Sequence, residues 1–178
     1  MHNATQRTIR PAVGANGAAE PGPPTAGRLP VVLDEVNRAI IEELQQDGRR
    51  PYGTIAEAVG LSEAAVRQRV QKLRDAGVVQ IVAVTDPLQV GFRSQAMVGI
   101  RADGDTRLVA ERLAAVDDID YVVLCTGSFD ILVELVTEDE DTLLELLNGV
   151  IRKIPGVRDT ETFMYLKLTK QTYTWGTR

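Results

Sequence analysis

The chain has 178 residues, 44% of them hydrophobic and 25% charged, and its 25 acidic side chains outnumber its 20 Lys and Arg for a net charge of −5. This composition is typical of a soluble globular protein with one sizeable core or two small ones. One cysteine, Cys125, excludes an internal disulfide framework, and one histidine, His2, near the N-terminus argues against a His-based triad or a His/Cys zinc site.

Residues 1–30 are rich in Pro, Gly and Ala and poor in large apolar residues, which predicts a disordered tail. This segment lacks the compact apolar region of a secretory signal, and the chain has no run of about 18 apolar residues that would span a membrane. Because the single cysteine also fits a reducing compartment, we expect a cytoplasmic protein without a membrane partner.

Two helices are predicted first in the folded part of the chain. The segment LDEVNRAIIEELQQDG predicts a helix that Asp34 caps and Gly48 ends. The segment TIAEAVG predicts a short second helix, with Thr54 and Glu57 at the spacing of a capping box and Gly60 as its left-handed stop. The expected inward-facing residues of these helices are Leu33, Val36, Ile40, Leu44, Ile55, Ala58 and Val59.

The segment LSEAAVRQRVQKLRDAG predicts a third helix that Ser62 caps and Gly77 ends. Val66, Val70 and Leu73 share one face, so this helix packs on the first two in a helix-turn-helix arrangement. Although the chain is acidic, residues 47–74 contain 6 basic and 3 acidic side chains. The candidate DNA-binding residues are Ser62, Ala64, Arg67, Gln68, Arg69, Gln71, Lys72 and Arg74.

The outer face of this third helix has the chemistry of a major-groove reader. Gln amides and Arg guanidinium groups pair with phosphates and base edges, and the small Ala64 allows a close approach to DNA. A solvated helix surface or a protein-binding module are the alternatives. The capped short helix, the Gly turn, the next cap at Ser62 and the local basic excess together favour DNA binding.

A second module follows an extended, β-branched linker over residues 79–91, which contains a turn at Asp86 and Pro87. Residues 92–168 alternate between strand and helix patterns in the order β-α-β-β-α-β, with Leu108, Val109, Leu113 and Val116 expected inward on its first helix. The predicted fold class is therefore α+β: an N-terminal winged-type helix-turn-helix domain, an extended linker and a C-terminal ferredoxin-like domain.

The middle strands of this second module are apolar on both faces, as in YVVLC and ILVELV. A ferredoxin-like sheet has helices on one face only, and an open face that met water would alternate with polar residues. We therefore expect the open face to be buried in a two-fold homodimer. Two recognition helices about one helical turn apart would then read a palindromic site on double-stranded DNA.

The chain resembles the Lrp/AsnC family, the leucine-responsive or feast/famine regulators. The resemblance rests on LDEVNRAIIEELQQDGR, IAEAVGLSEAAVRQRVQKLRDAGVV, CTGSFDILVEL and IPGVRDTETFMYLK in this order. It implies a helix-turn-helix domain (33–78), a linker (79–91) and a ferredoxin-like domain (92–170) that binds a small molecule, usually an amino acid. It also implies dimers that commonly assemble into octamers. The tail (1–30) and a C-terminal extension (171–178) are additions whose roles do not follow from it.

The resemblance also implies an effector site at a Gly-x-x-Asp turn, here Gly127, Ser128, Phe129 and Asp130. Gly127 permits a tight turn whose backbone amides suit a carboxylate, and Asp130 suits an α-amino group. The alternative is a plain hairpin turn that Asp130 caps. The last strand resembles the other segment that lines the family's effector site, and its candidates are Thr160, Thr162, Phe163 and Met164.

These observations predict a sequence-specific transcription regulator that responds to a small-molecule effector. We expect no enzyme activity, no cofactor and no metal site. One alternative is a nucleoid-type architectural protein with low sequence specificity, which would show a steep salt dependence and weak discrimination between sequences. The other is an enzyme or an enzyme-regulatory subunit built on the ferredoxin-like domain, which the lack of a Gly-rich phosphate loop disfavours.

Overall fold

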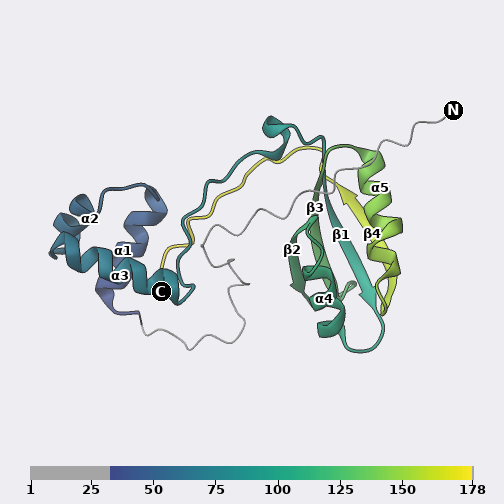
Figure 1. Ribbon diagram of the computed structural model, residues 1–178, viewed down its shortest axis with the longest axis horizontal. Helices are drawn as coiled ribbons and strands as arrows, with labels where there is room; N and C mark the ends of the chain where they lie inside the picture. The colour runs from purple at the N-terminus through teal and green to yellow at the C-terminus, as the bar shows by residue number, and fades with distance from the viewer. Residues whose placement is uncertain (1–32, 178) are drawn as a thin grey trace. The chain divides into compact units, whose positions relative to one another are not determined.

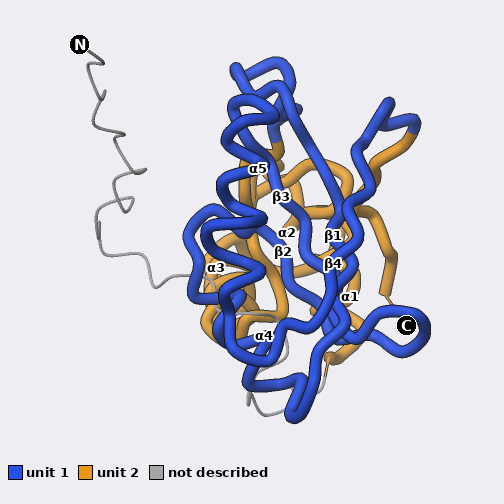
Figure 2. Tube along the Cα trace, turned by 90° about the vertical axis from the view of Figure 1, so that its right-hand side faces the viewer, with its two compact units in different colours: residues 1–15, 85–169 blue, residues 16–84, 170–178 orange. Residues whose placement is uncertain are grey.

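The computed structural model describes residues 33–177. These residues form two compact units, one of residues 33–84 with 170–177 and the other of residues 85–169 (Figure 2). The tail predicted over residues 1–30 lies outside the described residues. Among the described helices, none combines the length and the apolar character that crossing a membrane requires.

The N-terminal unit contains three helices (Figure 1): α1 (Glu35–Gln46), α2 (Tyr52–Val59) and α3 (Glu63–Asp75). Their apolar faces meet in one core that includes Ile40, Ile55, Val66 and Val70, each at most 1% exposed. The prediction that Ala58 faces inward is wrong, because Ala58 is exposed and Ala56 is buried in its place. The predicted helix-turn-helix is otherwise present.

Local capping residues set most of the helix ends. The carboxylate of Asp34 accepts a hydrogen bond from a backbone N–H of the first turn of α1, and the hydroxyl of Ser62 does the same for α3, as predicted. Gly60 follows α2 with φ 70°, the left-handed conformation that turns the chain sharply into α3. The last helical residue of α1 is Gln46, and Gly48, predicted to end this helix, follows directly after its C-cap residue Asp47.

The capping box predicted for α2 is wrong. The helix begins at Tyr52, directly after Pro51, and no side chain caps it. The carbonyl of Pro51 accepts the hydrogen bond of the Ile55 N–H, so Thr54 and Glu57 already lie inside the helix. Proline favours this early start, because its fixed φ and missing N–H are tolerated at a helix beginning.

After α3 the chain is extended, and residues 78–86 form no strand. The described part of the N-terminal unit therefore consists of helices and irregular segments, without the strands of a wing. The predicted turn is present as a short 3-10 helix, η1 (Pro87–Val90). The carboxylate of Asp86 caps it by accepting a hydrogen bond from the Leu88 N–H at 3.0 Å.

The second unit has the predicted β-α-β-β-α-β order (Figure 1). Its elements are β1 (Ser94–Ala102), α4 (Thr106–Ala114), β2 (Ile119–Leu124), β3 (Ile131–Thr137), α5 (Glu140–Gly149), η2 (Ile151–Lys153) and β4 (Val157–Met164). The strands form one antiparallel sheet in the order β2-β3-β1-β4. The two helices lie between consecutive strands, as in a ferredoxin-like fold.

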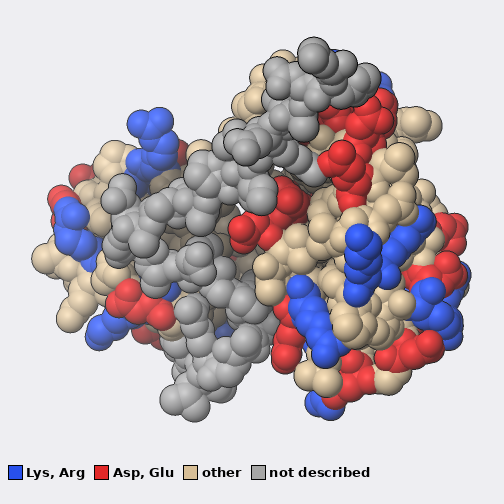
Figure 3. All heavy atoms as spheres, turned by 45° about the vertical axis from the view of Figure 1, so that its right-hand side comes forward, with Lys and Arg blue, Asp and Glu red and all other residues tan. Residues whose placement is uncertain are grey.

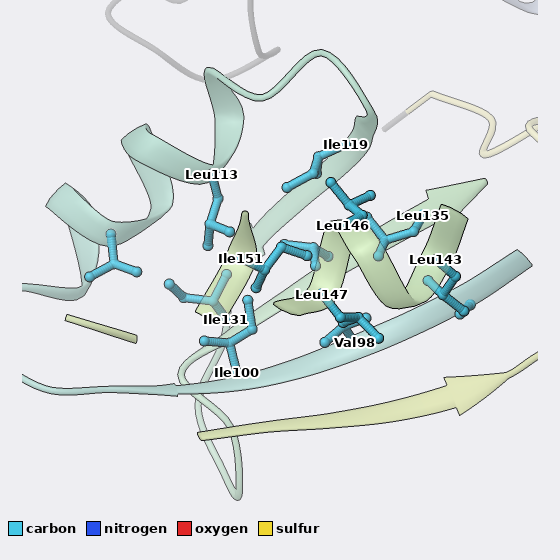
Figure 4. Packing of buried hydrophobic residues seen from close by; sticks show 13 residues of the cluster. Val98, Ile100, Leu113, Ile119, Ile131, Leu135, Leu143, Leu146, Leu147 and Ile151 are labelled. Carbon is cyan, nitrogen blue, oxygen red and sulfur yellow. The ribbon is translucent and has the colours of Figure 1, made fainter. Parts of the chain in front are cut away.

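One face of the sheet and both helices enclose the main core of this unit (Figure 4). Val98 and Ile100 of β1, Leu113 of α4 and Ile131 of β3 are fully buried there. The prediction that Leu108 faces inward is wrong, because that side chain is 50% exposed. Alternation along β1 and β3 means that every second side chain points away from this core.

We call the sheet surface that α4 and α5 leave uncovered the open face. It contains Met97 of β1, Leu132 of β3 and Val123 of β2, which are partly exposed in a single copy. Polar side chains are also present, since the Gln95 amide donates a hydrogen bond to the Glu134 carboxylate at 2.8 Å. The open face therefore combines an apolar strip with paired polar groups.

Candidate functional site

The outer face of α3 is exposed along its whole length. Its apolar side is fixed in the core by Val66, Val70 and Leu73, each at most 2% exposed. Helical periodicity then directs the remaining side chains to solvent. Seven of the eight predicted DNA-binding residues are exposed, namely Ser62, Ala64, Arg67, Gln68, Gln71, Lys72 and Arg74, whereas Arg69 is half-buried.

Arg69 points back onto α1. Its guanidinium donates to the carboxylate of Asp34 at 2.7 Å and to the side-chain oxygen of Asn37 at 3.0 Å. The hydrogen bond from Arg69, followed by that from the Asn37 N–H, lowers the pKa of the Asp34 carboxyl below its ordinary value. Arg69 therefore connects α3 to the start of α1.

Arg67 is held by two neighbours. Its guanidinium forms an ion pair with Glu63 one turn earlier on α3, at 2.7 Å, and lies over the ring of Tyr52 at 5.1 Å from the centroid. On the following turns, the Gln71 amide donates to the Asp75 carboxylate at 2.7 Å. Both pairs are solvent-exposed, so a stronger anion such as a phosphate can compete for the donors.

Lys72 and Arg74 form no ion pair with any described residue. Beside Lys72 a hollow of about 420 Å³ runs between α3 and α1, and Gln68 and Leu61 line it. Arg67, Arg69, Lys72 and Arg74 against Glu63 and Asp75 leave α3 with a net charge of +2. The whole chain has a net charge of −5, so the basic excess is a local property of α3. Acidic and basic side chains are interspersed on the face shown in Figure 3.

The predicted Gly-x-x-Asp turn connects β2 to β3. Gly127 has φ 128°, a conformation that side chains other than glycine rarely adopt. Backbone hydrogen bonds close the turn between Cys125 N–H and the Asp130 carbonyl, and between Asp130 N–H and the Ile100 carbonyl, both at 2.9 Å. The Asp130 carboxylate also accepts the Ala102 N–H at 2.9 Å, so Asp130 fixes the turn to the end of β1.

Phe129 folds over the open face at Gly99 of β1. A Cβ atom at position 99 would lie 2.7 Å from the Phe129 ring, so only glycine fits beneath it. The Phe163 ring meets Phe129 edge-on, with centroids 5.9 Å apart, and the Arg101 guanidinium lies 4.5 Å from the Phe129 centroid. Arg101 also donates to the Ser128 carbonyl at 2.9 Å. These groups bring the turn and the last strand together.

The other predicted residues of the last strand lie on the helix-covered face. Thr160 and Thr162 are the cross-strand partners of Ile100 and Val98, which are buried in the core, and paired residues share a face. The Thr160 hydroxyl accepts a hydrogen bond from Arg152, after α5, at 2.9 Å. Met164, opposite Ala96, belongs to the same face. Of the four candidates on this strand, Phe163 alone lies beside Phe129.

Gly99, Arg101 and Tyr52 were missed by the sequence reasoning. Gly99 had a usable signal, because glycine inside a strand pattern often marks a close approach of another group. Arg101 and Tyr52 had none, since their partners lie far away in the sequence. Among the described residues no group of three or more His, Cys, Asp or Glu side chains has the arrangement of a metal site.

Comparison with protein families matches both units. The AsnC-type helix-turn-helix domain matches residues 33–74, and the PF0864 C-terminal dimeric alpha+beta barrel domain matches residues 92–178. The HTH-type transcriptional regulator FL11 of Pyrococcus abyssi is 36% identical over 144 residues, which are 80% of this chain and 95% of that protein.

Solved structures of similar proteins share the fold. The leucine response regulatory protein LrpA of Mycobacterium tuberculosis has a TM-score of 0.71 and 28% identity over 78% of this chain and 96% of its own. The L-Met complex of the regulator NMB0573 from Neisseria meningitidis has a TM-score of 0.68 and 24% identity, covering 80% of this chain and 95% of that one. The likeness to NMB0573 shows a shared fold.

A helix-turn-helix unit followed by a ferredoxin-like α+β unit defines a two-module DNA-binding regulator. The chain belongs to the Lrp/AsnC family of transcriptional regulators and carries that family's DNA-binding domain.

Proposed function

We propose that the protein is a sequence-specific regulator that reads double-stranded DNA with α3 and changes its DNA binding when a small molecule, an amino acid or a related metabolite, binds to the second unit. The observation that carries the proposal is the exposed outer face of α3, which has donors and acceptors at its surface and an apolar side locked in the core. Such a helix offers base-edge contacts in the major groove at a fixed orientation.

The residues of α3 divide by the chemistry that each can offer. Arg67, Gln68 and Gln71 have the bidentate groups that read base edges, and Lys72 and Arg74 have charges suited to phosphates. Ser62 and Ala64 lie at the start of α3, where a small side chain and a capped helix end allow the closest approach. Arg69 contributes by holding α3 against α1 through Asp34.

The proposed effector site is the end of the open face, where Gly127, Ser128, Phe129 and Asp130 meet Phe163. A carboxylate there suits an amine, and the L-Met complex of the Neisseria protein supports an amino acid as ligand. Thr160, Thr162 and Met164 remain candidates only for a ligand that approaches from the helix-covered side of β4.

The proposed assembly is a homodimer through the open face, which can grow to an octamer. The apolar strip of Met97, Leu132 and Val123 supports this, as does the dimeric domain type that matches residues 92–178. A two-fold pair fits a palindromic operator. Because such a regulator acts on chromosomal DNA, we place it in the cytoplasm.

The test combines a thermal-shift screen of amino acids and related amines with a DNA titration. A ligand at about 100 times its Kd should add roughly 2.7 kcal/mol to the free energy of unfolding. The DNA is a duplex selected by the wild-type protein from a random-sequence library, beside a scrambled duplex of the same length and composition. Equal affinity for the two duplexes would point to an architectural protein instead.

A further inference from the structure

We propose that Tyr52 of α2 is a positioning residue for Arg67, and that Glu63 is an internal competitor which DNA must displace from Arg67. This inference rests on the proposed DNA-reading role of α3. The three residues, here named the Arg67 cluster, combine an ion pair of 2.7 Å with a guanidinium 5.1 Å from the centroid of an aromatic ring.

The ring is held more firmly than the cation. Tyr52 is partly buried and packs against the N-terminal core, whereas the Arg67 side chain is 64% exposed. A guanidinium over an aromatic face gains a cation–π attraction, and this attraction does not depend on the ion pair with Glu63. Tyr52 therefore restricts the plane and direction of Arg67 from below and leaves its outer edge accessible to DNA.

The Glu63 carboxylate contacts Arg67 at that outer edge. This carboxylate is 55% exposed and accepts a hydrogen bond from Arg67, so it holds the donor that a guanine or a phosphate would use. Glu63 also reaches back to α2, where its Oε2 lies 3.6 Å from the Cβ that Gly53 lacks. The negative charge of Glu63 repels the phosphates of any DNA that approaches α3. A group on the DNA that forms well-aligned hydrogen bonds with Arg67 offsets this repulsion, and other sequences do not.

The two residues therefore have different signatures in binding. Tyr52 should raise the affinity for the selected duplex, where the orientation of Arg67 counts, and have little effect on the affinity for scrambled DNA. Glu63 should lower the affinity for scrambled DNA more than the affinity for the selected duplex. It should therefore raise the ratio between the two affinities. A residue that only stabilises the fold would affect both duplexes equally.

The experiment measures the affinity of the full-length protein for the selected and scrambled duplexes at several salt concentrations. Tyr52→Leu should lower the affinity for the selected duplex about two- to fivefold and leave the affinity for the scrambled duplex unchanged. Tyr52→Phe should keep the wild-type affinity, because it keeps the ring. In an Arg67→Ala background Tyr52→Leu should have no further effect. Glu63→Gln should raise the affinity for the scrambled duplex about two- to fivefold and so lower the ratio of selected to scrambled affinity. Glu57→Gln removes one exposed acid elsewhere in the same unit and should leave that ratio unchanged.

The outcomes separate this inference from the proposed function. An equal loss on both duplexes for Tyr52→Leu, or a loss that persists without Arg67, would show that Tyr52 only packs against the core. An unchanged ratio for Glu63→Gln would remove its role as competitor. If Arg67→Ala and Gln68→Ala together leave affinity unchanged, the reading of DNA by α3 fails, and the positioning role fails with it. Circular dichroism and the melting temperature identify any variant that is not folded.

Discussion

The guanidinium of Arg69 on α3 donates to the carboxylate of Asp34, the capping residue of α1, at 2.7 Å. The Asp34 carboxylate therefore caps α1 and also contacts α3, 35 positions further along the sequence. The same contact lowers the pKa of Asp34, chiefly through the hydrogen bond from Arg69. The ion pair therefore supports the packing of α3 on α1, which the buried side chains of α3 already fix, and it weakens when Asp34 is protonated.

The first prediction concerns this pair. The pKa of Asp34 is depressed in the folded protein, so the pair stabilises the fold above the unfolded pKa of about 3.9 and loses that effect as pH falls through the folded value. Arg69→Ala should lower the melting temperature at neutral pH, and the difference from wild type should shrink on acidification below about pH 4. A pH series of thermal melts checks this, and a difference that is constant with pH would contradict it.

The second prediction concerns Gly99. Gly99→Ala places a methyl group 2.7 Å from the Phe129 ring, and the ring must leave its place over β1. We expect the free energy of unfolding to fall by about 1–3 kcal/mol, measured by denaturant titration. Gly149→Ala is the matched control, because nothing lies within 4 Å of its added Cβ, and it should be neutral or slightly stabilising. Equal effects of the two substitutions would show that Phe129 does not rest on Gly99.

The third prediction separates the two roles of Asp130. Asp130→Asn keeps an oxygen to accept the Ala102 N–H, so stability should change little, whereas Asp130→Ala leaves that donor unpaired at a cost of about 1–3 kcal/mol. If Asp130 also holds an effector amine, Asp130→Asn should weaken the ligand found in the thermal screen by about 1.5–3 kcal/mol, measured by calorimetry. Unchanged ligand affinity would leave Asp130 as the residue that fixes the turn and nothing more.

The fourth prediction concerns the open face. Leu132→Lys puts a charge in the middle of the apolar strip, where a second copy would have to bury it. Analytical ultracentrifugation should show a shift from dimers or larger assemblies toward monomers. Leu144→Lys on α5, where the side chain is already 55% exposed, should leave the dimer intact. A dimer that survives Leu132→Lys would exclude the open face as the interface.

The sequence predicted features that depend on near neighbours along the chain. The caps at Asp34 and Ser62 and the left-handed turn at Gly60 are local, and each is confirmed. The start of α2 was misplaced because Thr54 and Glu57 fit a capping box, while Pro51 before them allows a start three residues earlier. Both patterns are local, and the helix follows the one that Pro51 favours.

Features that depend on distant pairings were out of reach of the sequence. The helical pattern predicts an exposed Arg69, but its guanidinium donates a hydrogen bond to Asp34. No local pattern connects these two positions. Strand alternation alone separates Phe163 from Thr160, Thr162 and Met164, and the sequence could have predicted that division. Which of the two sets faces the helices depends on the register between β4 and β1, and that is set by pairing with a distant strand.

The most direct test of DNA reading by α3 is a gel-shift titration of Arg67→Ala and Gln68→Ala, singly and together, on the selected duplex at a fixed salt concentration. Each side chain is exposed on α3 and absent from the core, so the variants should melt like wild type. If either side chain reads a base or a close phosphate, its loss should weaken binding by about 1–3 kcal/mol and relax discrimination at the contacted position. A folded double variant that binds the selected duplex as tightly as wild type would contradict the account.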